Sequence, residues 1–132
     1  MPREIISTTE APRAIGPYSQ GIAVTAPGRI VFCSGQIPLD PTTGEVVGSG
    51  DVREQADQVL RNIAEVLGAG GASLAAVVKT TIYLTDLQDF GPVNEVYARY
   101  FPKDPPARAT VQVAGLPRGV QVEIEAIAVV DR

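Results

Sequence analysis

Length, composition and charge exclude several classes of protein. The chain has 132 residues, 45% of them hydrophobic, which suits one globular domain with one buried core. Its 15 acidic residues outnumber 11 basic ones without any run of like charges, so we expect no nucleic-acid partner. It has no histidine and one cysteine, Cys33, which leaves no internal disulfide and none of the usual zinc or cysteine-protease sites. No signal peptide or membrane-spanning stretch is evident, so we expect a cytoplasmic protein without a membrane partner.

The first third of the chain predicts short strands separated by glycine and proline. An apolar segment at 5–6 precedes a shaped loop over 11–19, where prolines and a glycine interrupt regular pairing. Residues 20–25 and 29–34 predict two strands joined by a turn at 26–28.

The middle of the chain predicts a loop, a helix and a strand. Three turn clusters make 37–50 a loop or a hairpin excursion. The clearest helix is 51–67, because its apolar residues form one stripe at three- and four-residue spacing, and the glycines from Gly68 onward predict its end. Residues 77–84 are rich in β-branched side chains and predict a strand that pairs with the earlier strands through a crossover.

The last third predicts a second helix and two strands. The helix is expected from Pro92 to Tyr100 or Phe101, where prolines end it. Strands at 107–113 and 120–130 follow. This order of strands, helix, strand, helix and strands predicts an α+β fold, with both helices over one face of a mixed sheet.

The last strand indicates that the sheet face without helices is also covered. Its C-terminal half is apolar on both sides, since Ala126, Ala128 and Val130 alternate with Ile127 and Val129. With no further helix available, another copy of the chain is the simplest cover. We therefore expect a closed homo-oligomer, whose number of subunits this pattern does not define.

Arg108 is the first candidate for chemistry. It opens a strand directly after two prolines, and a guanidinium held there is suited to a small carboxylate. From spacing alone, an ordinary surface arginine or an ion pair with Glu123 or Glu125 is the better interpretation. Those two glutamates share one strand face, which indicates either a solvated surface or carboxylates that position water at an oligomer seam.

Five segments, in order, resemble the reactive intermediate deaminase family, also called the Rid or YjgF family. They cover nearly the whole chain, so chance similarity is far less probable than for one short motif. The segments are residues 14–21, 34–38 with 43–45, 78–84, 89–90 with 93–97, and 106–111 with 122–124.

The resemblance implies a single chorismate-mutase-like α+β domain over 1–132, with a mixed six-stranded sheet and two helices on one face. It implies a homotrimer with a small site in each cleft between neighbouring subunits. The implied reaction is the hydrolysis of 2-iminobutanoate, 2-iminopropanoate and related enamines to 2-oxo acids and ammonia, without a cofactor. Pyridoxal-phosphate-dependent dehydratases would release these substrates.

The resemblance also assigns roles to residues. Arg108 would bind the substrate carboxylate and Glu123 would hold or activate the attacking water. The pocket would be lined by Tyr18, Ser34, Gly35, Asn94 and Thr110, with Phe90 in its apolar wall. Many members have cysteine at the position of Thr110, but that position is expected to contribute backbone groups, so activity should survive.

Two other reactive side chains have plainer interpretations. Cys33 lies within a predicted strand and is expected to be a buried, inert thiol, with no flanking lysine to lower its pKa. Lys79 could form an imine, but a strand lysine is more often solvated or ion-paired.

Three other functions compete with the deaminase. The first is a regulatory trimer that binds small carboxylates at Arg108 without turnover, and Glu123 argues against it because a pure binder does not need that residue. The second is a ribonuclease or translation inhibitor, which the acidic balance disfavours. The third is a chaperone-like trimer that should act even without Arg108.

Overall fold

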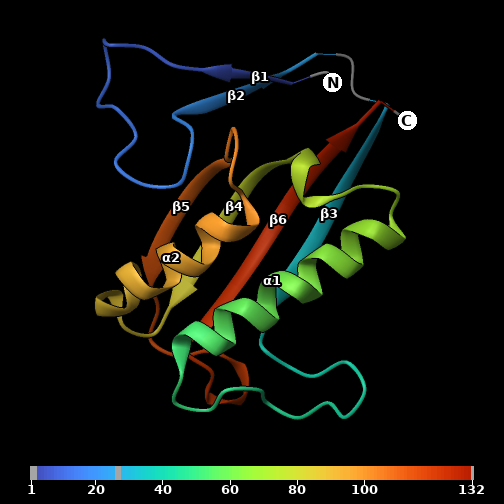
Figure 1. The fold of residues 1–132 in the computed structure, drawn as a ribbon, viewed down its shortest axis with the longest axis vertical. Helices are drawn as coiled ribbons and strands as arrows, with labels where there is room; N and C mark the ends of the chain where they lie inside the picture. The colour runs from blue at the N-terminus through green and yellow to red at the C-terminus, as the bar shows by residue number, and fades with distance from the viewer. Residues whose placement is uncertain (1–2, 26–27, 132) are drawn as a thin grey trace.

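The computed structural model describes residues 3–25 and 28–131, in which two helices lie side by side over a four-stranded sheet (Figure 1). The short 3₁₀ turns are Leu74–Ala76, Leu87–Asp89 and Pro117–Gly119. The main elements are β1 Arg3–Ile6, β2 Gly21–Val24, β3 Arg29–Gln36, α1 Val52–Ala69, β4 Val77–Leu84, α2 Phe90–Tyr100, β5 Ala107–Gln112 and β6 Val122–Val130.

The six strands form two sheets. The four-stranded sheet has the order β3-β6-β4-β5, with β4 and β5 parallel and β6 antiparallel to both β3 and β4. The strands β1 and β2 form a separate antiparallel ribbon, joined to the edge strand β5 by a single bridge between Ser19 and Ala107. The mixed α+β fold with both helices on one face is therefore confirmed, whereas the predicted six-stranded sheet is divided into four strands and two.

The divided sheet has a local cause in the loop before β2. The proline- and glycine-containing loop over 11–19 meets β5 only at its last residue, Ser19, and β2 then pairs with β1 from Gly21 onward, so one residue pair continues the sheet. The predicted crossover pairing also differs, because β4 pairs with the later strands β5 and β6, and β6 separates it from β3. Two residues of the predicted turn at 26–28, Ala26 and Pro27, lie outside the described residues.

Both ends of helix α1 are capped, by a side chain at its start and by backbone at its end. The Asp51 carboxylate accepts hydrogen bonds from the backbone N–H groups of Arg53 and Glu54 at the first turn. The helix passes through Gly68 and ends at Ala69, because the capping contacts are made by the backbone N–H of Gly70. Its buried stripe packs on the sheet and comprises Val52, Gln55, Ala56, Val59, Leu60, Ile63 and Leu67.

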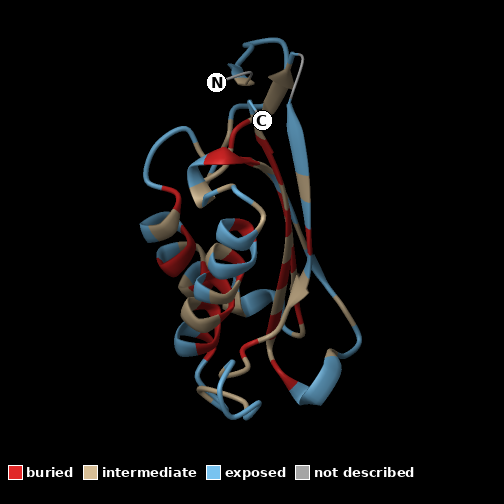
Figure 2. Cartoon of the chain, turned by 90° about the vertical axis from the view of Figure 1, so that its right-hand side faces the viewer, coloured by how far each residue is buried: buried red, intermediate tan, exposed pale blue. Residues whose placement is uncertain are grey.

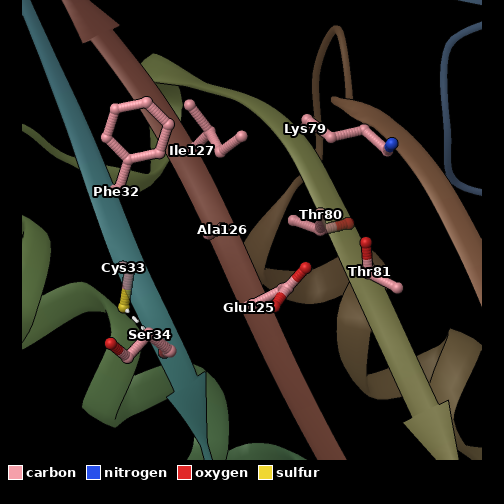
Figure 3. Close-up of a pocket in the computed structure, with 9 residues that line it drawn as sticks. All are labelled: Phe32, Cys33, Ser34, Lys79, Thr80, Thr81, Glu125, Ala126 and Ile127. Carbon is pink, nitrogen blue, oxygen red and sulfur yellow. Dashed lines mark hydrogen bonds between the residues drawn. The ribbon is translucent and has the colours of Figure 1, made fainter.

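The core lies between the helices and the sheet, and neither α1 nor α2 covers the opposite sheet face (Figure 2). On this open face Phe32 is 71% exposed and Ile30 is 49% exposed. The centre of the open face holds a hollow of about 220 Å³, with Phe32 and Ile127 at one end and Lys79, Thr81 and Glu125 near the other (Figure 3). Both α1 and α2 therefore lie on the same face of the sheet, as predicted.

Candidate functional site

The side chain of Arg108 points to the helix-covered face of the sheet. Arg108 is the second residue of β5 and pairs in register with Thr80 of β4, which is 1% exposed beneath α2. One guanidinium nitrogen, Nη1, donates a 2.8 Å hydrogen bond to Oδ1 of Asn94 on α2. Strand β5 thus fixes the backbone of Arg108, and helix α2 binds its guanidinium group.

Three aromatic rings surround the guanidinium. The Cζ atom of Arg108 lies 5.4 Å from the ring centre of Tyr18, 5.5 Å from that of Phe90 and 5.1 Å from that of Tyr97. At these distances each ring face attracts a cation. We name the group of Tyr18, Phe90, Asn94 and Arg108 the arginine half-site.

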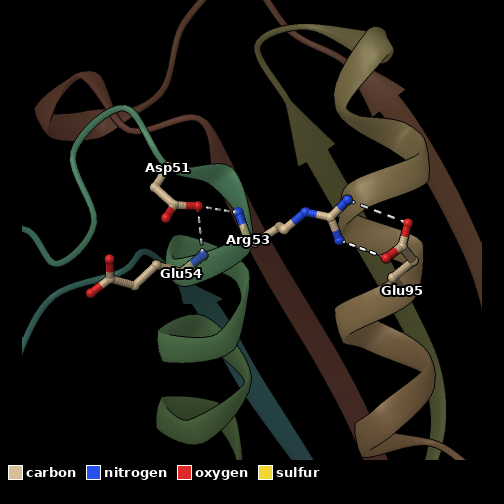
Figure 4. A network of polar contacts seen from close by, with 4 residues as sticks. All are labelled: Asp51, Arg53, Glu54 and Glu95. Carbon is tan, nitrogen blue, oxygen red and sulfur yellow. Dashed lines mark hydrogen bonds and ion pairs between the residues drawn. The ribbon is translucent and has the colours of Figure 1, made fainter.

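The charge of Arg108 has no carboxylate partner among the residues that the structure describes. The ion pairs found there are Arg53 with Glu95, which joins α1 to α2 (Figure 4), and Arg61 with Asp57. Burial lowers the pKa of Arg108, and the nearby Tyr97 and Tyr18 oppose that shift. A half-buried cation that is paired only with a neutral amide and aromatic rings is prepared to receive an anion.

The N-terminal ribbon holds the segment that leads into Arg108. The hydroxyl of Ser19 donates to the carbonyl of Pro105, and its backbone N–H donates to the carbonyl of Pro106 at 3.1 Å. The guanidinium of Arg3 reaches the carbonyl of Asp104 at 2.9 Å. These contacts place Tyr18, the residue before Ser19, over Arg108.

The predicted carboxylate Glu123 lies on the other face of the sheet. It stands on β6 between the fully buried Val122 and Ile124, so its side chain points to the open face, beside Tyr83 of β4. The backbone of Gly35 approaches it closely, and a Cβ on Gly35 would lie 2.9 Å from Cδ of Glu123 and closer still to Oε2. A side chain at position 35 would therefore displace the carboxylate.

Ser34 precedes Gly35 and lines the hollow of the open face with Glu125 (Figure 3). We name Ser34, Gly35 and Glu123 the glutamate half-site. Within one chain the sheet separates it from the arginine half-site. The structure thus brings the predicted residues together in two groups on opposite faces, and it does not bring the two groups to each other.

Thr110 shares a strand face with Arg108, and its hydroxyl is buried. Its Oγ1 atom is buried and has no hydrogen-bond partner among the described residues. That this position contributes backbone groups to the pocket stays a prediction.

The remaining sequence candidates keep their plain interpretations. Cys33 is 4% exposed, and burial raises the pKa of its thiol, which disfavours the reactive thiolate. Lys79 is exposed at the edge of the open-face hollow. Within residues 3–25 and 28–131 no three His, Cys, Asp or Glu side chains are grouped as metal ligands, and no helix there is long and apolar enough to cross a membrane.

Known proteins resemble this chain over nearly its full length. The family model described as Endoribonuclease L-PSP matches residues 8–130. Protein DfrA of Myxococcus xanthus is 59% identical over 129 residues, which are 98% of this chain and 97% of that protein. The mouse protein named 2-iminobutanoate/2-iminopropanoate deaminase is 55% identical over 127 residues, or 96% of this chain and 91% of its own.

Solved structures agree with the sequence relatives. The crystal structure of E. coli TdcF with bound serine has a TM-score of 0.72 and 46% identity, and the match covers 96% of this chain and 98% of that one. The chain belongs to the Endoribonuclease L-PSP family, and the resemblance to the reactive intermediate deaminases is confirmed by relatives of that name.

Proposed function

We propose that this protein is a cofactor-independent deaminase that hydrolyses 2-iminobutanoate, 2-iminopropanoate and the corresponding enamines to 2-oxo acids and ammonia. The observation that carries the proposal is the cation of Arg108, half-buried among aromatic rings and bonded to a neutral amide. Such a site fits one carboxylate next to a short apolar group. The name of the mouse relative supports the same chemistry.

The reaction needs orientation and one proton carrier. Arg108 holds the carboxylate, and the protonated imine carbon of the substrate is already an electrophile. Glu123 takes a proton from a water molecule while the oxygen of that water bonds to the imine carbon. Glu123 then returns the proton to the nitrogen of the tetrahedral adduct. The C–N bond then breaks and ammonia leaves, while the carboxylate of Glu123 takes the proton of the adduct's hydroxyl group, so that the C=O bond of the 2-oxo acid forms. Holding the reactants in place removes several kcal/mol of the barrier, about 7–11 in well-oriented systems.

The two half-sites are complementary only between copies of the chain. We infer a homotrimer in which the open face of one subunit, with Glu123, lies against the β5 edge of its neighbour, with Arg108. The exposed Phe32 and Ile30 supply apolar area for that contact. Each cleft would then contain one arginine half-site and one glutamate half-site from different subunits.

The reaction is tested with imine generated by a pyridoxal-phosphate-dependent dehydratase acting on threonine, the kind of enzyme that we expect to supply the substrate. Wild type should accelerate imine disappearance. Arg108→Ala should lower kcat/KM by about 10²–10³-fold, because it removes a charged hydrogen-bonding partner of the carboxylate. Arg61→Ala is the matched control, since that arginine pairs with Asp57 on the surface of α1. A wild-type rate equal to that of Arg108→Ala contradicts the proposal.

Mixed trimers test the division between subunits. Arg108→Ala and Glu123→Gln proteins are each inactive by the proposal, and equal amounts are unfolded together and reassembled. If the half-sites come from different subunits, about a quarter of the clefts combine an intact Arg108 with an intact Glu123. If both residues act within one chain, the mixture stays inactive.

Binding without turnover is the main alternative. In that case Arg108→Ala abolishes binding of 2-oxobutanoate, while wild type and Glu123→Gln leave imine decay equally unaffected. An endoribonuclease is disfavoured by the excess of 15 acidic over 11 basic residues, since RNA affinity depends mainly on phosphate contacts. A chaperone-like trimer would protect unfolding clients even as the Arg108→Ala protein. The cytoplasmic location remains a prediction.

A further inference from the structure

Tyr97 links the guanidinium of Arg108 to the core of the protein. It is 0% exposed in the middle of α2, and its ring centre lies 5.1 Å from Cζ of Arg108, nearer than the other two rings. Its hydroxyl lies 2.6 Å from Oγ1 of the buried Thr80. Thr80 is also the residue of β4 that pairs in register with Arg108. The three residues therefore form a closed ring of contacts, from backbone pairing through the hydroxyl pair to the aromatic face.

The other contacts of Arg108 are less constrained. Phe90 is 36% exposed at the first turn of α2, and Tyr18 stands on the loop before β2. Asn94 occupies one guanidinium nitrogen and leaves the remaining N–H donors for a ligand. An arginine side chain has many rotamers, and binding a ligand restricts it to one of them at a cost in conformational entropy. A fixed ring beneath the guanidinium reduces that loss before the ligand arrives.

We propose that Tyr97, held by Thr80, is a positioning residue that presets Arg108 for the substrate carboxylate. The inference rests on the proposed function of Arg108. Tyr97 does not touch substrate, because its side chain is fully buried and its hydroxyl is used by Thr80. Burial also raises its pKa to about 12, so it keeps its proton at neutral pH and acts as a tether.

The test compares Tyr97→Phe, Thr80→Val and the double variant. Each single variant removes the hydroxyl pair and should weaken binding of 2-oxobutanoate by about three- to tenfold, the effect of one lost hydrogen bond. KM for the imine should rise by the same factor while kcat stays within about twofold, because uniform binding is lost. The double variant should bind no worse than Tyr97→Phe, since both changes act on one contact. Binding of the neutral analogue 2-oxobutanamide should change less than binding of the acid.

Tyr100→Phe is the matched control on the same helix. The hydroxyl of Tyr100 bonds to Asp57 of α1, so its loss affects helix packing without affecting the arginine. A general loss of stability would weaken binding in this variant too. The positioning role is overturned if Tyr97→Phe binds 2-oxobutanoate within twofold of wild type while Arg108→Ala has lost binding. If Arg108→Ala binds and reacts like wild type, the proposed function fails as well, and the two failures are thereby distinguished.

Discussion

The two half-sites differ in how completely one chain builds them. The guanidinium of Arg108 is held by groups from a loop and a helix, with rings at 5.1–5.5 Å and a hydrogen bond of 2.8 Å to Asn94. Glu123 lies on an uncovered sheet face, where the backbone of Gly35 packs closely against its side chain. The arginine half-site is therefore formed within one chain, whereas the glutamate half-site would gain its surroundings only in the proposed trimer, where another copy covers that face.

The largest effect is expected from a charge that disrupts the inferred subunit contact at the open face. Phe32→Glu places a charge on a side chain that is 71% exposed in the single chain and buried in the inferred trimer. We expect the protein to become monomeric and to lose nearly all deaminase activity while its helices remain folded. Sedimentation and circular dichroism measure assembly and folding separately.

The control for this change is Val66→Glu on the helix layer. Val66 is an exposed apolar residue of α1, so the same charge is introduced away from the open face. It should leave the trimer intact. A Phe32→Glu protein that remains trimeric and active would show that the open face is not the subunit contact.

Gly35→Ala tests the glutamate half-site alone, with the next largest effect. The added Cβ would overlap the end of the Glu123 side chain, which can swing away at little cost to folding. The displaced carboxylate should lower kcat by about ten- to a hundredfold, as expected for a catalytic group moved by about 1 Å. Binding of 2-oxobutanoate to Arg108 should be nearly unchanged.

The matched change is Gly44→Ala in the 37–50 loop. A Cβ on Gly44 has open space around it, although its φ of 74° adds backbone strain there. It should cost some stability and leave kcat unchanged. Equal kcat values for Gly35→Ala and wild type would show that the position of the Glu123 carboxylate does not affect the reaction.

The fold was predictable where the sequence carries a local pattern. β4 has the predicted bounds, Val77–Leu84, because its β-branched residues favour a strand. The division of the strands into two sheets was not predictable, since strand propensity does not say which strands pair. Likewise, spacing along β6 placed Glu123 and Glu125 on one face but could not place that face relative to Arg108.

Tyr97 contacts Arg108 but was not among the site residues predicted from the sequence, because the pairing of distant segments was unknown. An aromatic residue at helical spacing is ordinarily a core residue, and Tyr97 is indeed in the core. The available signal was its position relative to Phe90 and Asn94, because residues at i, i+4 and i+7 share one face of a helix. That signal identifies a face only once the strand carrying Arg108 is known to lie against it.

Alkaline pH should have a moderate effect on stability through Tyr97, the buried ring that contacts the arginine half-site. Burial raises the pKa of Tyr97 to about 12, so the folded chain keeps a proton that the unfolded chain loses near pH 10. The corresponding stabilisation is fully present below pH 10 and is lost as pH rises toward 12. Between pH 9 and 11 wild type should lose about 1 kcal/mol more unfolding free energy than Tyr97→Phe, as measured by urea unfolding. Parallel curves for the two proteins would contradict a buried, protonated Tyr97.

The smallest effect is expected from a change at Thr110. This prediction compares two threonines whose side chains lie on the same face of the sheet. Thr80 uses its hydroxyl to hold Tyr97, whereas the buried hydroxyl of Thr110 has no partner among the described residues. Thr110→Val keeps the shape and removes an unsatisfied polar group, so the free energy of unfolding should stay level or rise by up to about 1 kcal/mol. The same change at Thr80 should lower it, because the hydroxyl of Tyr97 then loses its partner. Imine turnover by Thr110→Val should stay within about twofold of wild type, and a larger loss would mean that this hydroxyl turns toward the substrate during the reaction.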